Sequence, residues 1–283
     1  MPLMDGRMFM GSSMDYNEYM HQVVCVKGVP ASAAELELRD DGTLDDEWVT
    51  YELNEWDEYA LEEAVSIREG VGGTVTALMV GDRAKEDLVF RSLAKGADRA
   101  VRVDGEGLDQ ADTFAKARVA AGAIDDMDDP PTLVYTGLQA ADTANAQFGG
   151  TVAATLDLPF TSFIVGVEYE DGADVLTVRR ELEGGLEERR ELEIPAVLGI
   201  QTGLNDPPYA SIREIRAARD KPVVERSLDE FGLGPVAVTE MAMTGVNRYF
   251  EPEVEDAATV FEGDPDETAN ELAETLVELG VVR

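Results

Sequence analysis

The stretch that decides the fold runs from Thr74 to Gly137. Short apolar runs alternate in it with segments whose apolar residues recur at helical spacing. In order these are TVTALMVG (74–81), KEDLVFRSLAKG (85–96), RAVRV (99–103), ADTFAKARVAAGAI (111–124) and TLVYTG (132–137). The rhythm of strand, helix, strand, helix, strand predicts an α/β fold with a parallel-core sheet and helices on both faces.

The preceding residues extend this rhythm by one strand and one helix. QVVCVK (22–27) is a short apolar run that predicts the first strand, and NEWDEYALEEAVSIREG (54–70) predicts a helix with Asn54 as its N-cap. Residues 31–51 predict a loop or irregular hairpin. Residues 1–20 predict a flexible extension, and Met20 is a candidate natural start.

The second half of the chain changes character. FIVGVEYE (163–170), DVLTVRRELE (174–183) and LEERRELEIP (186–195) alternate polar and apolar residues, and the last two predict a hairpin. AVLGIQT (196–202) predicts a further buried strand, and ASIREIRAARD (210–220) a short helix. We therefore expect an α/β domain over residues 21–220.

From Lys221 onward prolines, glycines and acids are frequent and no strong core signal appears. The chain closes on DPDETANELAETLVELG (264–280), a predicted helix with Asp264 as N-cap and Pro265 in its first turn. Residues 221–283 therefore predict a C-terminal arm that wraps a partner. A disordered tail with a frayed helix is the competing interpretation.

The charge balance is strongly acidic. Lys and Arg total 23 against 59 Asp and Glu, a formal net charge of −36. Molar salt shortens the Debye length to about 3 Å and screens such repulsion, so we interpret the composition as adaptation to a salt-loaded, halophilic cytoplasm. The competing interpretation of this composition is an acidic interaction protein. Nucleic acid and anionic membranes are poor partners for this charge.

Several classes of site are excluded by what the chain lacks. A single cysteine, Cys25, rules out a disulfide framework and a multi-cysteine metal site. A single histidine, His21, expected on the surface, cannot build a zinc cluster or a His-centred triad. We predict no metal and no catalytic side chain. No apolar run long enough for membrane insertion and no secretory signal is present, which makes the cytoplasm the expected location.

Ligands of parallel sheets bind outside the carboxyl ends of the strands, near a topological switch point. The candidate loops follow Lys27, Val80 and Thr136. The last of them, Gly137–Gly150, interleaves small residues with polar ones and leads into a helix. A helix N-terminus suits a phosphate, and small residues let the backbone approach it. Close packing of a small-residue helix on the sheet is the competing interpretation.

Five blocks in order resemble the electron transfer flavoprotein beta subunits. They are VVCVKGVP (23–30), NEWDEYALEEAV (54–65), GADRAV (96–101), GLQAADTANAQFGG (137–150) and VRRELEGGLEERRELEIPAVLGIQTGLNDPPYASI (178–212). The resemblance covers roughly Met20 to Leu233, and its last block is the most specific.

The resemblance implies an adenine-nucleotide alpha-hydrolase-like (Rossmann-like) fold and an alpha subunit that holds the redox-active FAD. It implies AMP in this subunit, or a second FAD in electron-bifurcating members, where that FAD takes a hydride from NADH. Carried over by position, the cofactor-binding residues are Cys25, Lys27, Asn54, Asp57, Val80, Gly81, Gly137, Gln139, Ala140, Asp142, Thr143, Asn145, Ala146, Gln147 and Gly149.

The resemblance also implies docking partners. These are flavin dehydrogenases, met by a recognition loop over residues 206–215, and a quinone oxidoreductase of the membrane. Ile212 stands where an apolar anchor is usual, with Tyr209 close by. An apolar residue inserted into a partner groove is a plausible hot spot. An ordinary core contact is the alternative for Ile212.

The chain also departs from the family pattern. Glu55 replaces a proline, Leu138 a basic residue, Ala144 an acid and Pro208 an arginine. The lost positive charge fits the acidic composition, and it leaves AMP and a second FAD as open alternatives. The NEWDEYALEEA block and the long arm favour the nitrogen-fixation-linked, bifurcating branch, whereas Ala144 counts against it.

Another class of function also suits such a sheet. An ATP-binding, universal-stress-like or nucleotide-hydrolysing domain would require a Gly-rich triphosphate loop. Neither a Walker A pattern nor G-x-G-x-x-G after the first strand occurs. We therefore expect an electron carrier subunit.

Overall fold

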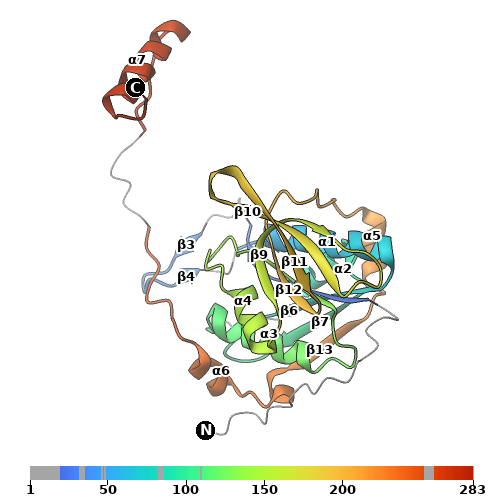
Figure 1. Cartoon of the computed structure of the whole chain (residues 1–283). Coiled ribbons are helices and arrows are strands. Elements are labelled where there is room, and N and C mark those ends of the chain that lie inside the picture. The colour runs from blue at the N-terminus through green and yellow to red at the C-terminus, as the bar shows by residue number, and fades with distance from the viewer. Residues whose placement is uncertain are drawn as a thin grey trace. The chain divides into compact units, whose positions relative to one another are not determined.

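The structure, a computed structural model, describes residues 20–31, 36–45, 47, 49–81, 86–108, 110–251 and 258–282. The predicted N-terminal extension lies outside these residues except for Met20. A nine-stranded sheet dominates the fold, in the order β11-β10-β9-β12-β8-β1-β6-β7-β13 (Figure 1). Its strands are β1 (His21–Val26), β6 (Thr74–Val80), β7 (Arg99–Asp104), β8 (Leu133–Gly137), β9 (Phe160–Glu168), β10 (Val175–Leu182), β11 (Leu186–Glu193), β12 (Ala196–Ile200) and β13 (Val223–Ser227).

The centre of the sheet is parallel, and one end of it is antiparallel. β1 pairs in parallel with β6 and β8, and β12 pairs in parallel with β8 and β9. β10 runs antiparallel to β9 and β11, and the turn Glu183–Gly185 joins the predicted hairpin. The predicted α/β class with a parallel-core sheet is confirmed.

Helices cover both faces, as predicted (Figure 1). Two buried clusters lie on opposite faces of the sheet, because successive side chains of a strand point to opposite faces. In β1, Val24 and Val26 belong to one cluster, and Val23 and Cys25 belong to the other. The first cluster includes α1 (Glu55–Val71), α2 (Glu86–Ala94) and the end of α5 (Ile212–Ala218). The second includes α3 (Thr113–Asp125), α4 (Phe148–Leu156), the turn Leu228–Phe231 and α6 (Pro235–Met241).

The region after Lys221 contributes more to the core than its sequence indicates. β13 extends the sheet by pairing in parallel with β7, and Leu228 and Val238 are buried. VVERS is short and half polar because an edge strand needs few apolar side chains, so it carries a weak periodic signal. The compact α/β unit extends to Asn247, beyond the expected boundary at residue 220.

His21 also differs from expectation, since its side chain is fully buried at the start of β1 rather than on the surface. Within residues 31–51, predicted as a loop or irregular hairpin, the described residues include one short pair of strands, and a second short pair flanks the segment. β2 (Gly28–Pro30) pairs with β5 (Tyr51–Leu53), and β3 (Glu37–Leu38) pairs with β4 (Leu44–Asp45).

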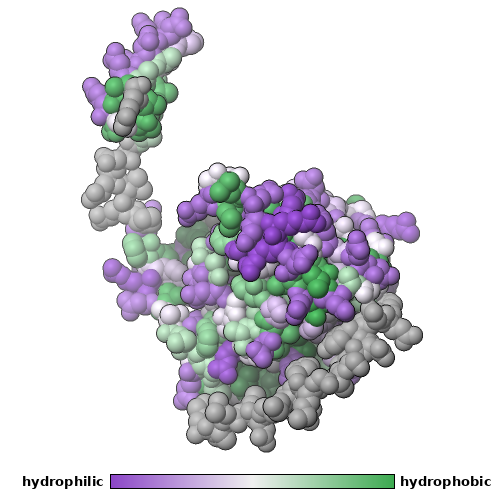
Figure 2. All heavy atoms as spheres, viewed as in Figure 1, coloured by the Kyte–Doolittle hydropathy of each residue, from purple (hydrophilic) through white to green (hydrophobic). Residues whose placement is uncertain are grey.

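A second, small unit comprises Leu38–Leu44 and the chain from Arg248 onward. Its helix α7 (Pro265–Glu278) begins as predicted, because the Asp264 side chain accepts from the N–H groups of Asp266 and Glu267. Apolar side chains of α7 stay exposed, among them Leu272 and Val277. On the large unit, hydrophilic side chains gather over the β10–β11 hairpin (Figure 2).

Candidate functional site

The strand order creates a switch point at β1. The chain adds β6 and β7 on one side of β1, and then returns to place β8 on its other side. Ligands of parallel sheets bind where successive connections diverge in this way. The residues that follow β1 and β8, Lys27 and Leu138, therefore border the candidate site.

The first turn of α1 holds these strand ends through Asp57. Its two carboxylate oxygens accept from the backbone N–H groups of Lys27, at 2.8 Å, and Gly137, at 3.1 Å. Burial raises the pKa of Asp57 to about 7, against the opposing effect of its hydrogen bonds with Asn54, Lys27 and Gly137. Asp57 is therefore a link inside the protein at the edge of the site.

Asn54, directly before α1, makes a second link of this kind. Although it occupies the predicted N-cap position, its side chain makes no cap hydrogen bond. Its amide instead donates to the Gln139 carbonyl at 2.8 Å and accepts from the Ala141 N–H at 3.0 Å. This pair of bonds orients the loop that follows β8.

Lys27 is the basic side chain at this edge, and it already has a partner. Its ammonium donates to both carboxylate oxygens of Asp142, at 2.6 and 2.8 Å. The pair is partly exposed, so it contributes little stability by itself. It neutralises the lysine, which leaves backbone N–H groups and side-chain amides as the donors for an anion.

The loop between β8 and α4 faces solvent. Residues 141–147, which include Thr143, are all exposed, and Ala144 and Ala146 adopt left-handed φ values of 48° and 51°. Left-handed alanines cost about 1–2 kcal/mol each. Such backbone strain concentrates at binding sites.

The helix α4 begins at Phe148, with Gln147 at the N-cap position and no side-chain cap bond. Its first N–H groups are therefore left to solvent or a ligand. Gly149 lies inside the first turn, where a Cβ would lie 2.5 Å from the Thr136 hydroxyl. Position 137 likewise has no room for a side chain, because Asp57 and Trp56 lie close to it. Close packing explains these two glycines.

The remaining predicted residues lie at the ends of neighbouring strands. Cys25 is buried in β1, and burial raises the pKa of its thiol well above its usual range. Only its backbone can approach a ligand. Val80 ends β6 and Gly81 follows it, where a Cβ on Gly81 would meet open space. Ala140 lies in the β8 loop between Gln139 and Ala141.

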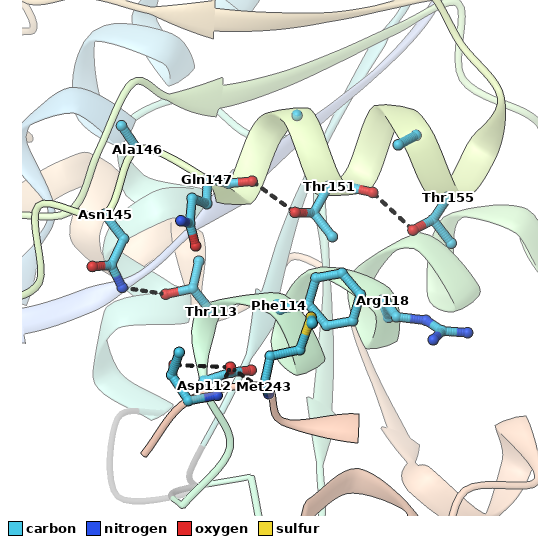
Figure 3. A pocket seen from close by; sticks show the side chains of 13 residues that line it. Asp112, Thr113, Phe114, Arg118, Asn145, Ala146, Gln147, Thr151, Thr155 and Met243 are labelled. Carbon is cyan, nitrogen blue, oxygen red and sulfur yellow. Dashed lines mark hydrogen bonds between the residues drawn. The ribbon is translucent and has the colours of Figure 1, made fainter. Parts of the chain in front are cut away.

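A hollow of about 760 Å³ lies between α3 and α4, next to Asn145–Gln147 (Figure 3). The Asn145 amide donates to the Thr113 hydroxyl at its margin, at 3.1 Å. Sequence reasoning missed most of its lining. The missed residues are Asp112, Thr113, Phe114, Arg118, Thr151, Ala154, Thr155, Met243 and Thr244.

Asp112 organises one wall of this hollow. One carboxylate oxygen caps α3 by accepting from the Ala115 N–H at 2.9 Å. The other accepts from the N–H groups of Met243 and Thr244 and from the Thr244 hydroxyl. A cap signal before α3 is visible in the sequence, but its second partner lies 131 residues away.

The predicted recognition loop presents apolar side chains to solvent. Tyr209 is 100% exposed and Ile212 71%, so most of the Ile212 side chain faces solvent. α5 begins next to them with a capping box between Ser211 and Glu214. The Lys95 ammonium donates to the Pro208 carbonyl at 2.9 Å, which ties the loop to the end of α2.

Within the described ranges, no group of three or more potential metal ligands comes together. Among the same residues, no helix is long and apolar enough to cross a membrane.

Comparisons with known proteins point to one family. The sequence model of one protein family, the electron transfer flavoprotein domain, matches residues 41–231. The electron transfer flavoprotein subunit beta of Methylophilus methylotrophus is 38% identical over 264 residues, which cover 92% of this chain and 98% of the relative. The Bacillus subtilis subunit beta is 33% identical, covering 84% of this chain and 88% of the relative. Subunit CarD of the caffeyl-CoA reductase-Etf complex of Acetobacterium woodii is 32% identical, covering 91% and 97%.

Proposed function

Because this chain belongs to the electron transfer flavoprotein family as a beta subunit, we propose that it acts in a heterodimer with an alpha subunit, carrying electrons between flavin dehydrogenases and a membrane quinone reductase. The alpha subunit would hold the redox-active FAD. The exposed apolar residues of α7 support an arm that docks on such a partner.

We infer that this subunit binds an adenine nucleotide at the switch point. The observation that carries the inference is the set of bonds from Asn54 and Asp57 to the ends of β1 and β8. These bonds fix the start of an exposed loop that leads to the uncapped start of α4. Such an arrangement suits a phosphate, because backbone N–H groups can bind it without a lysine or arginine.

The residues present fit this ligand. Ala144 to Gln147 and the first N–H groups of α4 would hold phosphate, and Asp142 would accept from ribose hydroxyls after releasing Lys27. The open space at Gly81 and the backbone of Cys25 suit the base. A bound flavin supplies the electron transfer itself, whereas the protein supplies its position and environment.

AMP and a second FAD remain the two candidates for this ligand. The hollow of about 760 Å³ next to Asn145–Gln147 favours FAD, the larger ligand, because the hollow extends from the loop along α3 and α4. A second FAD would make bifurcation of NADH electrons the alternative function. The similarity to CarD, a subunit of a reductase complex, is consistent with either function.

The experiment is to co-express the chain with the alpha subunit of its source, purify the complex in molar salt, denature it and identify the released nucleotides. One FAD and one AMP per heterodimer would support the simple carrier, and two FAD would support bifurcation. ATP alone would favour the nucleotide-hydrolysing class. A stable chain that retains neither an alpha subunit nor an adenine nucleotide would overturn the proposal.

A further inference from the structure

Both carboxylate oxygens of Asp57 are bound to backbone N–H groups of different strands. One accepts from Lys27, directly after β1, and the other from Gly137, the last residue of β8. Asp57 is 6% exposed. β1 and β8 are adjacent parallel strands, so a single carboxylate joins the two strand ends that border the switch point.

The geometry around this link leaves little freedom. A Cβ on Gly137 would lie 2.4 Å from an Asp57 oxygen and 2.7 Å from the Cβ of Trp56. Trp56 is itself tied to the residue after β12, because its indole N–H donates to the Gln201 amide oxygen at 2.9 Å. The first turn of α1 thus sets where the strand ends lie.

The link depends on the charge state of the carboxyl group. An ionised carboxylate accepts at both oxygens, whereas a carboxylic acid carries one O–H donor. Both backbone partners of Asp57 are N–H donors, so in the acid form the protonated oxygen meets an N–H only as a weaker acceptor. Protonation therefore weakens one of the two bonds and loosens the hold on the end of β1 or of β8.

The surrounding groups place this change in the neutral range. Burial raises the pKa of Asp57 to about 7, and the Lys27 ammonium opposes the rise while it is bound to Asp142. The buried Cys25 thiol is the other titratable group that interacts with Asp57. Because burial favours the neutral acid, the folded chain tolerates protonation. The effect of protonating Asp57 is therefore local to the ends of β1 and β8.

We propose that Asp57 is a positioning residue whose ionised carboxylate holds the ends of β1 and β8 in the arrangement that binds the nucleotide, so that protonating it weakens nucleotide binding. The proposal rests on the nucleotide site inferred above. It assigns Asp57 no contact with the nucleotide.

The test measures binding of AMP to the full chain by calorimetry between pH 6 and pH 8 in molar KCl. The ionised fraction of Asp57 falls from about nine-tenths at the upper end to one-tenth at the lower end, so the apparent Kd should rise roughly tenfold on acidification. The phosphate of AMP also titrates, with a pKa of about 6. The same measurement is therefore made with adenosine, which lacks that phosphate, so that a pH dependence of its binding comes from the protein.

Asp57→Asn should bind adenosine weakly and with no pH dependence, because its amide keeps an N–H donor against the backbone at every pH. Glu55→Gln, which removes the same charge at an exposed position of the same turn, should behave as the unchanged chain. Gly137→Ala should weaken binding without changing the charge. It keeps the proposal testable if Asp57→Asn does not fold.

A second measurement needs no ligand. The amide proton signals of Lys27 and Gly137 should titrate together near neutral pH, and this titration should vanish in Asp57→Asn. Tight binding of adenosine by Asp57→Asn, or the same Kd at pH 6 and pH 8, would overturn the proposal and leave the nucleotide site intact. Amide signals that titrate normally in a chain that binds no adenine nucleotide would instead refute the nucleotide site, and with it the positioning role.

Discussion

At the scale of single residues, His21 shows how a buried titratable group makes stability depend on pH. Its Nδ1–H donates to the Asp129 carbonyl at 2.7 Å, and its Nε2 accepts from the Thr76 hydroxyl at 2.8 Å. Arg99 lies 3.0 Å from the same Nε2. The neutral ring satisfies all these contacts. A proton on Nε2 would face the Arg99 guanidinium.

Burial lowers the pKa of His21, with the Arg99 charge acting in the same direction and the contacts to Asp129 opposing it. A histidine whose folded-state pKa is depressed stabilises the fold above its unfolded value of about 6.5. That contribution is lost as the pH falls through the lower folded-state pKa.

We therefore predict that the free energy of unfolding falls below about pH 6, and that His21→Gln is less stable at pH 7.5 but loses less on acidification. Urea unfolding of both chains at several pH values measures this. Because Asp57 acts with the opposite sign, the difference between the two chains is the informative quantity. Parallel pH curves would contradict the assignment to His21.

At the scale of elements, Asp112 joins the start of α3 to the segment at Met243 and Thr244. We predict that Asp112→Ala costs about 0.5–2 kcal/mol, as for other caps, and also frees the wall of the hollow. Asp264→Ala is the matched control, because Asp264 caps only its own helix.

Hydrogen exchange at the Met243 and Thr244 amides is the measurement. Their protection should fall in Asp112→Ala and stay unchanged in Asp264→Ala. Unchanged exchange in both variants would show that other contacts hold this wall.

Ile212, at the start of α5, is the second prediction at this scale. Because 71% of it is exposed, Ile212→Ala should change the free energy of unfolding by less than about 0.5 kcal/mol. Since Ile212 is the proposed anchor, the substitution should slow electron transfer to or from the partner dehydrogenase. Val236→Ala, at a position 67% exposed, is the control.

Flavin content and electron-transfer rate of the heterodimer separate the two roles of Ile212. A slower rate with full flavin content supports docking. A loss of flavin, or an unchanged rate, would contradict it.

At the scale of the whole molecule, the excess of 59 acids over 23 bases leaves a formal net charge of −36, and the unpaired acids repel one another. Arg189 and Glu168 form one exposed pair, since they lie 2.7 Å apart with both side chains more than half exposed. Such pairs contribute about 0–1 kcal/mol. Salt weakens them, but it weakens the long-range repulsion as well.

We predict that the melting temperature rises steadily from about 0.1 M to about 2 M KCl, because the Debye length shortens over this range. Sucrose at matched osmolality controls for effects that are not electrostatic. A melting temperature that falls or stays constant in KCl would contradict the interpretation of the charge as salt adaptation.

The sequence alone determined the fold class and predicted which loops border the candidate site. Period-2 and period-3.6 patterns are local, so TVTALMVG, TLVYTG and the segments between them predict their own structure. The five family blocks added the partner class and the candidate residues. The weak pattern of VVERS hid β13, because an edge strand lacks a strong apolar signal.

Only the tertiary structure decided what the site residues contact. Asn54 occupies a cap position in the sequence, yet its side chain binds the loop 85 residues ahead. Asp57 meets residues 27 and 137 because the strand order brings β1 and β8 together, and Asp112 meets Met243 because the chain returns past α3. Periodicity reports which side of an element is apolar, whereas the partner of a polar side chain depends on how distant elements pack.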